Sequence, residues 1–446
     1  MGFKRIPIIV SLVVLVGWPF INQMFIKQSG LDKAIDKQVV RMEPAVPWNL
    51  AMGYIHYKKI LGKIEKHLLA NKNIPPLEGL IEKNSMDNKT LVLVIGESTN
   101  RQRMGIYGYQ RNTTPHLSEL KNELLLFDNV YAPRPYTIET LEQVLTFADE
   151  QNPDLYLTRP NIINMMKQAG YKTYWITNQQ TQTKRNTLLT TFSKQADEQI
   201  YLNNNRAQDS AQYDESVLIP FEKVLKKPEA KKFIVVHLLG THRKYHYRYP
   251  ESYDFFTGDD NVTEGLSQSQ RQEYNEYDNA VLYNDYVVSE LVNQLKHSDQ
   301  NALLTYFSDH GEEVYDNPQD LFAGRNEGKP TSNMYTIPFI IWQSKSWKRS
   351  VLGIHGDDIT HRPYSTSNFI YTWSDLSGIY YDDHLESSSL VNSGFKPGPI
   401  WIGDPSRPDK LRNLLKSPFD DIPGYPSDYQ HFSKKNSDDG KQKTAI

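Results

Sequence analysis

The chain has 446 residues, which is enough for one large domain or two ordinary ones. Its net charge of -3, with no broad basic stripe, gives no sign of a nucleic-acid partner. It contains no cysteine, which excludes disulfides, thiolate chemistry and catalytic groups derived from cysteine, but does not by itself indicate a cellular compartment.

The N-terminal run from Ile6 to Ile26 carries no charge and is flanked by Lys4, Arg5 and Lys27. As a helix it reaches roughly 30 Å, the thickness of a hydrocarbon core. A cleaved signal peptide is the alternative, but no small-residue cleavage site follows the run. The sequence therefore predicts a cytoplasmic N-terminus over residues 1–5 and one membrane anchor over 6–26.

Residues 27–88 are expected to form a juxtamembrane helical linker. Between Trp48 and Leu69, apolar residues recur at helical spacing with lysines between them. The pattern suits a helix lying on a membrane surface or one packed on the main domain. The catalytic domain is expected over 89–415, followed by a tail over 416–446 that becomes charged, polar and disordered towards its end.

Strand-like and helix-like patterns alternate along the predicted catalytic domain. The predicted strands are Leu91–Ile95, Thr173–Thr177, Phe233–Leu239, Leu303–Phe307 and Ile337–Trp342. The predicted helices are Ile138–Ala148, Ile162–Gly170, Glu215–Lys226 and Tyr277–Leu295. This alternation predicts an α/β fold with a mostly parallel sheet flanked by helices. In such sheets, ligands bind beyond the carboxyl ends of the strands.

One predicted strand, Leu91–Ile95, runs directly into Gly96 and Glu97. The glycine would let the backbone pass close to a ligand, and the carboxylate would then be a metal ligand. The alternative is that Glu97 and Ser98 cap a following helix.

A second predicted strand, Leu303–Phe307, is followed by Asp309 and His310. An adjacent carboxylate and imidazole at a strand exit suit a metal ion. The alternative is that the Asp-His pair only forms a capped turn. This alternative is less favoured because Glu97 provides a third ligand at the same edge of the predicted sheet.

A hydroxyl group stands at the start of the first predicted helix. Thr137 follows Pro133-Arg134-Pro135, and its oxyanion would be stabilised there by the helix dipole and free backbone amides. The alternative is that Thr137 only caps the helix. Thr140 is a competing hydroxyl one turn further in, where it is better placed to bond an upstream carbonyl.

Two histidines, His237 and His242, flank Gly240 at the exit of the strand Phe233–Leu239. A single histidine is more often structural, but a pair around a glycine at a strand exit favours a site. The nearby segment Tyr245–Pro250 adds aromatic and cationic groups able to surround a phosphate and an ammonium group.

Two carboxylates, an imidazole and a hydroxyl at one sheet edge suit zinc, with the hydroxyl as a metal-activated nucleophile. This combination predicts a hydrolase or transferase that acts on a phosphate-type ester.

The motifs resemble those of the phosphoethanolamine transferases of Gram-negative bacteria, a branch of the alkaline phosphatase/sulfatase superfamily. The resemblance spans roughly Leu91 to Leu376. It rests on Gly96-Glu97-Ser98, His237-x-x-Gly240-x-His242, Tyr277-Asp278-Asn279 and Ser308-Asp309-His310-Gly311-Glu312. Trp175–Gln180 and Gly324–Thr331 resemble the branch that modifies the heptose of the lipopolysaccharide core.

The resemblance implies a sulfatase-like fold in a bacterial inner-membrane protein, here single-pass, with its catalytic domain in the periplasm. It implies one or two zinc ions, with Glu97, Thr137, Asp309 and His310 as the ligands. Thr137 would carry a covalent phospho-threonine intermediate between a phosphatidylethanolamine donor and a lipopolysaccharide acceptor, at a core sugar or lipid A. The implied substrate-binding residues are His237, His242, Asn178, Gln180, Asn326 and Glu327.

Several positions depart from the pattern of the lipid A branch. Ala132-Pro-Arg-Pro-Tyr-Thr137 replaces a cysteine-containing nucleophile segment, and Thr183 stands where that branch has a lysine. A histidine beyond the Asp-His pair is replaced near Arg325–Glu327. The family also has several membrane helices, and this sequence shows one.

Two other functions remain open from the sequence. One is a phosphoglycerol transferase or phosphodiesterase of the same superfamily, and the other is an inactive, membrane-anchored binding protein. A sulfatase is disfavoured because the chain has no cysteine and no Ser-x-Pro-x-Arg segment.

Overall fold

The computed structural model describes residues 74–180, 187–203, 211–298, 301–350, 359–405, 407–417 and 419. The predicted anchor over 6–26, most of the predicted linker and nearly all of the predicted tail lie outside these ranges. Among the described residues, no helix has both the length and the apolar character needed to cross a membrane.

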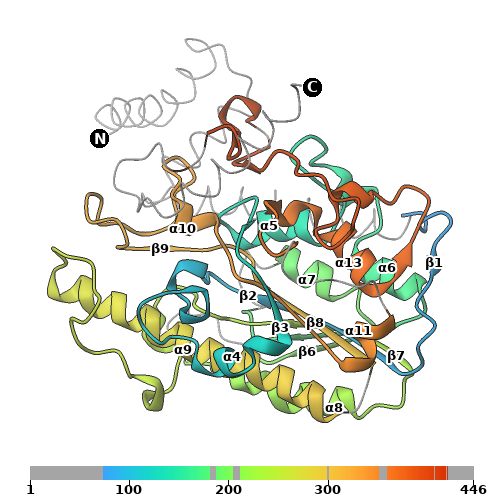
Figure 1. Cartoon of the computed structure of the whole chain (residues 1–446), viewed down its shortest axis with the longest axis horizontal. Helices are drawn as coiled ribbons and strands as arrows, with labels where there is room; N and C mark the ends of the chain where they lie inside the picture. Colours follow the sequence, from blue (N-terminus) through green and yellow to red (C-terminus); the bar gives the residue numbers. More distant parts are fainter. Residues whose placement is uncertain are drawn as a thin grey trace, which may run out of the picture. The chain divides into compact units, whose positions relative to one another are not determined.

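A seven-stranded sheet forms the centre of the fold (Figure 1). Its strands, in spatial order, are β3 (Leu124–Phe127), β11 (Phe339–Gln343), β8 (Asn301–Ser308), β2 (Lys89–Gly96), β7 (Lys231–His237), β5 (Lys172–Thr177) and β6 (Glu198–Tyr201). Every pairing from β8 to β6 is parallel, and β11 runs antiparallel to both of its neighbours. The predicted mostly parallel sheet is confirmed.

Helices cover both faces of this sheet (Figure 1). On one face lie α4 (Pro115–Glu119), α8 (Leu218–Leu225) and α9 (Gln268–His297). On the other lie α5 (Thr137–Val144), α6 (Ile162–Gln168), α7 (Thr187–Ser193), α11 (Lys345–Ser350) and α13 (Phe369–Ser377), and α10 (Ser332–Tyr335) precedes β11. The strand β2 is buried throughout, and its alternating residues supply both cores: Leu91 and Leu93 face α5 and α6, and Val92 and Val94 face α9.

Short elements surround the central layers. Four two-stranded pairs are β1 (Ile81–Glu82) with β13 (Ile379–Tyr380), β9 (Glu313–Val314) with β10 (Ala323–Gly324), β4 (Val130–Tyr131) with β12 (Tyr364–Ser365), and β14 (Trp401–Ile402) with β15 (Arg412–Asn413). Residues 74–88, which the sequence assigns to the linker, therefore contribute a strand that pairs on the catalytic domain. Leu77 is buried in the core between the sheet and the helices α5, α6 and α13.

Two predicted boundaries differ from those observed because a helix cap and a proline set them. The helix α9 starts earlier than the predicted Tyr277 because Ser267 and Gln270 form a capping box at Gln268. The strand β11 starts after Pro338, which has no N–H to donate to a neighbouring strand. The strands β3 and β6 were not predicted, since a short apolar run and a polar edge strand carry weak periodic signals.

Candidate active site

The carboxyl ends of neighbouring parallel strands lie level with one another. Gly96, the last residue of β2, pairs with Ser308, the last residue of β8. The chain leaves both strands at adjacent positions, so Glu97 and Asp309 emerge next to each other at this edge of the sheet. His237 ends β7 on the other side of β2.

Glu97, Asp309 and His310 form a buried cluster whose ligand atoms all lie within 4.8 Å of one another. Nε2 of His310 is 3.3 Å from Oε1 of Glu97 and 3.4 Å from Oδ2 of Asp309. That Oδ2 atom is buried and has no hydrogen-bond partner among the described residues. The predicted metal ligands are therefore assembled as the sequence suggested.

The tautomer of His310 leaves Nε2 available to a metal. Nδ1 lies 2.8 Å from the carbonyl oxygen of Gly311. Because a carbonyl oxygen only accepts, Nδ1 carries a proton whether or not the ring is charged, so Nε2 is the atom that can take up either a second proton or a metal. A Cβ on Gly311 would come within 2.0 Å of the carbonyl oxygen of Asn333, so this close backbone passage needs glycine.

Thr137 is the first residue of α5, and its hydroxyl lies against the cluster. Oγ1 donates to Oε2 of Glu97 at 2.9 Å and is 3.4 Å from Nε2 of His310. The N-cap residue is Tyr136, so the alternative that Thr137 only caps the helix is wrong. Thr140 is buried and donates its hydroxyl to the carbonyl oxygen of Arg134 at 2.8 Å.

The capping alternative for Glu97 is also wrong, because Asn100 caps the next helical turn, Arg101–Arg103. The expectation for Gly96 needs correction as well. A Cβ there would come within 3.0 Å of the ring of Tyr306, so the glycine makes room for that side chain and not for a ligand.

The charges of the cluster shift the pKa values of its members. Burial and the negative charge of Glu97 raise the pKa of Asp309 to about 7. Burial alone would raise the pKa of Glu97 too, but hydrogen bonding and positive charge from His310 hold it well below its usual range. Two carboxylates thus share one small buried space, and a divalent cation would remove the repulsion between them.

The loop after β7 is fixed to the backbone of Glu97. The amide and hydroxyl of Thr241 both donate to the carbonyl oxygen of Glu97 at 3.0 Å. Gly240 has a positive φ of 54°, and a Cβ there would come within 2.7 Å of the same oxygen. Asp214 accepts hydrogen bonds from the amides of Leu239 and Gly240 at 2.9 and 2.7 Å. The loop that carries His242 is therefore rigidly placed beside the cluster.

The two predicted substrate histidines differ in exposure. His237 is buried, packs edge-on against Trp175 and has no hydrogen-bond partner for Nε2 among the described residues. His242 is half-buried. Burial lowers the pKa of each to about 4, against the opposing charge of Glu97, so both imidazoles are neutral near pH 7.

The other predicted substrate residues lie in different surroundings. Asn178 is buried and donates to Asp214 at 2.8 Å, which gives it a part in holding the loop after β7. Gln180 is buried, and Asn326 is exposed. Glu327 accepts two hydrogen bonds from Arg134, at 2.6 and 3.1 Å. Among the described residues, the hydrogen bonds of the side chains of Asn178, Asn326 and Glu327 lead away from the cluster.

Besides Ser98, whose hydroxyl donates to Oε1 of Glu97 at 2.7 Å, two side chains that the sequence analysis did not select as site residues reach the cluster. Nε2 of Gln179 donates to Oε2 of Glu97 at 3.1 Å and to the carbonyl oxygen of Leu238 at 2.8 Å. Nη1 of Arg325 lies 2.6 Å from Nε2 of His310. Gln179 lies beside the two residues that were selected, and Arg325 lies beside Asn326, so the resemblance indicated the right loops but not the right side chains.

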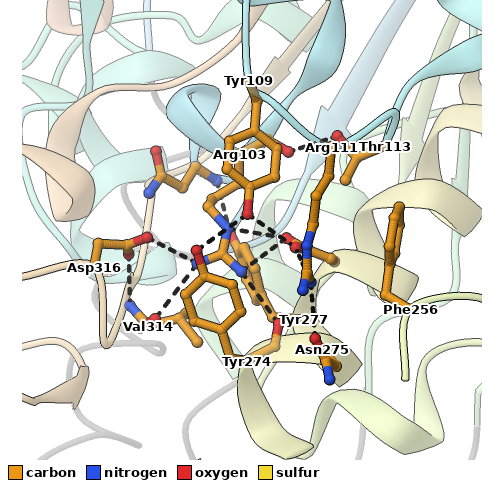
Figure 2. A network of polar contacts seen from close by, with 12 residues as sticks. Arg103, Tyr109, Arg111, Thr113, Phe256, Tyr274, Asn275, Tyr277, Val314 and Asp316 are labelled. Atoms are coloured by element: carbon orange, nitrogen blue, oxygen red, sulfur yellow. Dashed lines mark hydrogen bonds and ion pairs between the residues drawn. The ribbon is translucent and has the colours of Figure 1, made fainter. Parts of the chain in front are cut away.

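A buried ionic network joins the two ligand-bearing loops to α9 (Figure 2). Arg103 pairs with Asp278 of α9 at 2.8 Å and with Asp316, beyond His310, at 2.7 Å. Figure 2 shows its guanidinium beside the ring of Tyr274, whose centroid is 3.6 Å away. The hydroxyl of Tyr277 donates to the carbonyl oxygen of Ser98, next to Glu97, at 2.8 Å. Both loops are thus anchored on one helix.

Comparison with known proteins agrees with this arrangement. The chain matches the family described as Sulfatase over residues 89–379. Together with the α/β fold and the buried ligand cluster, this match places the chain in the sulfatase family.

Individual members of this family are similar to the chain over most of its length. The chain is 49% identical over 423 residues to the phosphoethanolamine transferase EptC of Escherichia coli K12, covering 93% of this chain and 73% of the relative. It is 50% identical over 423 residues, with the same coverage of both chains, to the phosphoethanolamine transferase CptA of Salmonella typhimurium LT2. The chain therefore belongs to the phosphoethanolamine transferases of the sulfatase family, as the sequence motifs predicted.

A solved structure extends the comparison. The C-terminal periplasmic domain of EptC from Escherichia coli, in complex with zinc, superposes with a TM-score of 0.75 at 51% identity. The match covers 79% of this chain and 100% of that domain.

Proposed function

We propose that this chain transfers phosphoethanolamine from phosphatidylethanolamine to lipopolysaccharide, with Thr137 as the nucleophile. The observation that carries the proposal is the position of the Thr137 hydroxyl, 2.9 Å from Glu97 and 3.4 Å from His310. The names of the similar proteins support the transferred group. The nucleophile is supported by the geometry and by the helix N-terminus at which Thr137 lies.

The residues of the cluster fit one zinc ion. Glu97, Asp309 and His310 would hold it together with Oγ1 of Thr137, and the lack of a hydrogen-bond partner for Oδ2 of Asp309 among the described residues supports this assignment. When bound, zinc would lower the pKa of the hydroxyl and offset negative charge on the phosphoryl oxygens. The zinc in the related EptC domain supports the choice of metal.

The transfer of phosphoethanolamine proceeds in two steps, first to Thr137 and then to lipopolysaccharide. Oγ1 of Thr137 forms a bond to phosphorus, the bond from phosphorus to the diacylglycerol oxygen breaks, and that oxygen takes up a proton. The threonine proton is directed at Oε2 of Glu97. A hydroxyl oxygen of lipopolysaccharide then forms a bond to the same phosphorus, the bond from phosphorus to Oγ1 of Thr137 breaks, and the proton of the attacking hydroxyl passes to Oγ1. His242 is neutral near pH 7 and follows Thr241, whose amide bonds the backbone of Glu97, so its ring would offer an N–H donor to the phosphoryl oxygens.

The test uses the full chain in detergent micelles with head-group-labelled phosphatidylethanolamine and purified lipopolysaccharide. The proposal predicts that diacylglycerol and labelled lipopolysaccharide appear together. Labelled free phosphoethanolamine without labelled lipopolysaccharide would indicate a phosphodiesterase. Transfer from labelled phosphatidylglycerol instead would indicate a phosphoglycerol transferase. No turnover and no bound zinc would support an inactive binding protein.

The location is part of the proposal. The uncharged run Ile6–Ile26 supports a single inner-membrane anchor, and the periplasmic domain of EptC supports a periplasmic catalytic domain. A reporter fused after Ile446 should be active in the periplasm. Activity of that reporter in the cytoplasm would contradict a lipopolysaccharide acceptor, because that acceptor is met outside.

A further inference from the structure

Arg325 places a guanidinium group at the metal-ligand cluster. Its Nη1 is 2.6 Å from Nε2 of His310 and 3.7 Å from Oε1 of Glu97. The side chain is 17% exposed, so the group stands between the buried cluster and solvent. In the part of the chain that the structure describes, its recorded hydrogen bond uses Nη1 alone. The other guanidinium N–H groups therefore remain for a ligand.

Arg325 and a metal compete for the same atom. In the neutral ring, Nε2 of His310 has one lone pair, since Nδ1 donates to the carbonyl oxygen of Gly311. That lone pair accepts a hydrogen bond or binds a metal, but not both. With zinc bound, Nη1 must turn to another acceptor. The reaction supplies one close by, because Oγ1 of Thr137 lies 3.4 Å from the same Nε2 and would carry the phosphoryl group.

The surroundings keep the guanidinium charged and near the nucleophile. Burial opposes its charge, but the carboxylates of Glu312 and Glu97 outweigh that effect and raise the pKa of Arg325 above its usual range. Glu312 is fully buried, and neither of its oxygens has a hydrogen-bond partner among the described residues. Glu327, in the same loop as Arg325, is paired with Arg134, just before Thr137. The loop of Arg325 is thereby tied to the nucleophile segment.

We propose that Arg325 is a further catalytic residue, which binds the nonbridging oxygens of the phosphoryl group carried by Thr137. This inference rests on the proposed phosphoryl transfer and names the side chain that neutralises the transferred group. A guanidinium offers parallel N–H donors that match two phosphate oxygens. It would stabilise the charge that spreads over those oxygens in the transition state.

The first test measures binding and does not depend on the identity of the donor. Inorganic phosphate is titrated calorimetrically into the zinc-loaded full chain, and zinc content is measured in parallel. Arg325→Ala should weaken phosphate binding about tenfold or more and keep its zinc, since a charge-assisted hydrogen bond is lost. Arg271→Ala removes an exposed arginine paired with Asp259 and should bind phosphate like the wild type. Unchanged phosphate binding in Arg325→Ala, or loss of its zinc, would overturn the proposal.

The second test separates catalysis from support of the fold. With labelled phosphatidylethanolamine, Arg325→Ala should lose about 100- to 1,000-fold in kcat, as expected for one transition-state donor. The kcat of Arg325→Lys should lie between those of the wild type and Arg325→Ala, because lysine keeps the positive charge but lacks the parallel N–H donors of a guanidinium group. Added guanidinium chloride, at millimolar concentration, should restore part of the activity of Arg325→Ala and none of that of Thr137→Ala. Full activity of Arg325→Ala, or a loss that guanidinium does not reverse, would contradict the assignment. A wild-type chain that binds phosphate through Arg325 but releases no diacylglycerol would refute the proposed donor and leave the phosphate site standing.

Discussion

The hydroxyl of Thr137 and the carboxylate of Glu97 are joined by a hydrogen bond of 2.9 Å across 40 residues of sequence. The bond links the start of α5 to the end of β2, so the nucleophile and the first metal ligand are held by two separate elements of the same core. Thr140, one turn further along α5, makes no such contact and bonds the carbonyl oxygen of Arg134.

These two threonines predict opposite behaviour. Thr137→Ala should abolish transfer while the melting temperature and zinc content stay close to those of the wild type. Thr140→Ala should keep measurable activity and lose about 1 kcal/mol of stability, because a buried carbonyl oxygen loses its donor. Activity is measured as diacylglycerol release, and stability by thermal melting. Turnover by Thr137→Ala would show that another group attacks phosphorus.

Zinc binding should depend on Asp309. Asp309→Ala removes a carboxylate whose Oδ2 has no hydrogen-bond partner in the described protein, and the variant should lose most of its zinc as measured by metal analysis. The matched control is Asp285→Asn, a buried aspartate that accepts hydrogen bonds from the amides of His116 and Leu117 away from the cluster. This control should retain its zinc. Full zinc content in Asp309→Ala would show that the ligand set is wrong.

The pH dependence of zinc affinity follows from the pKa of Asp309, which burial and Glu97 raise to about 7 in the metal-free protein. Zinc needs the ionised carboxylate, so protons compete with it below that pKa. Affinity should fall as the pH drops through about 7, and the fall should be steeper than one proton gives, because the carboxylates of Asp309 and Glu97 outweigh burial and raise the pKa of the ligand His310 as well. The measurement is competition with a zinc-sensitive dye between pH 5.5 and 8. An affinity that did not change across pH 7 would contradict the shifted pKa.

The ionic network of Figure 2 should support the fold more than the chemistry. Arg103→Met leaves Asp278 buried with Arg111 as its remaining guanidinium partner, and breaking a buried pair in this way costs about 3–5 kcal/mol. Arg271→Met, at an exposed pair on α9, should change stability by less than about 0.5 kcal/mol. Urea unfolding compares the two variants. Equal free energies of unfolding for the two variants would mean that the ionic network contributes little to the stability of the fold.

The sequence predicted the residues whose positions follow from strand ends. Glu97 and Asp309 could be predicted because β2 and β8 are parallel neighbours whose last residues pair. The residues that follow them therefore lie together at the carboxyl edge of the sheet. Thr137 was selected because it falls at the position of the family's nucleophile, at a helix start that can stabilise its oxyanion. These rules need no knowledge of side-chain direction.

The sequence did not predict which loop side chains turn towards the cluster. Gln179 contacts Glu97, whereas its neighbour Asn178 contacts Asp214. Similarly, Arg325 contacts His310, and Glu327 pairs with Arg134. Adjacent residues in a loop point in different directions according to backbone angles that tertiary packing sets, so composition identifies the loop and not the contact.

The covalent adduct tests the central claim most directly. The full chain is incubated with phosphatidylethanolamine in the absence of acceptor, quenched with acid, digested and mapped by mass spectrometry. The account predicts phosphoethanolamine on Thr137 in the wild type, no adduct in Thr137→Ala, and loss of the adduct when lipopolysaccharide is added before quenching. An adduct on Thr140 or on any other residue, or transfer to lipopolysaccharide by Thr137→Ala, would contradict it.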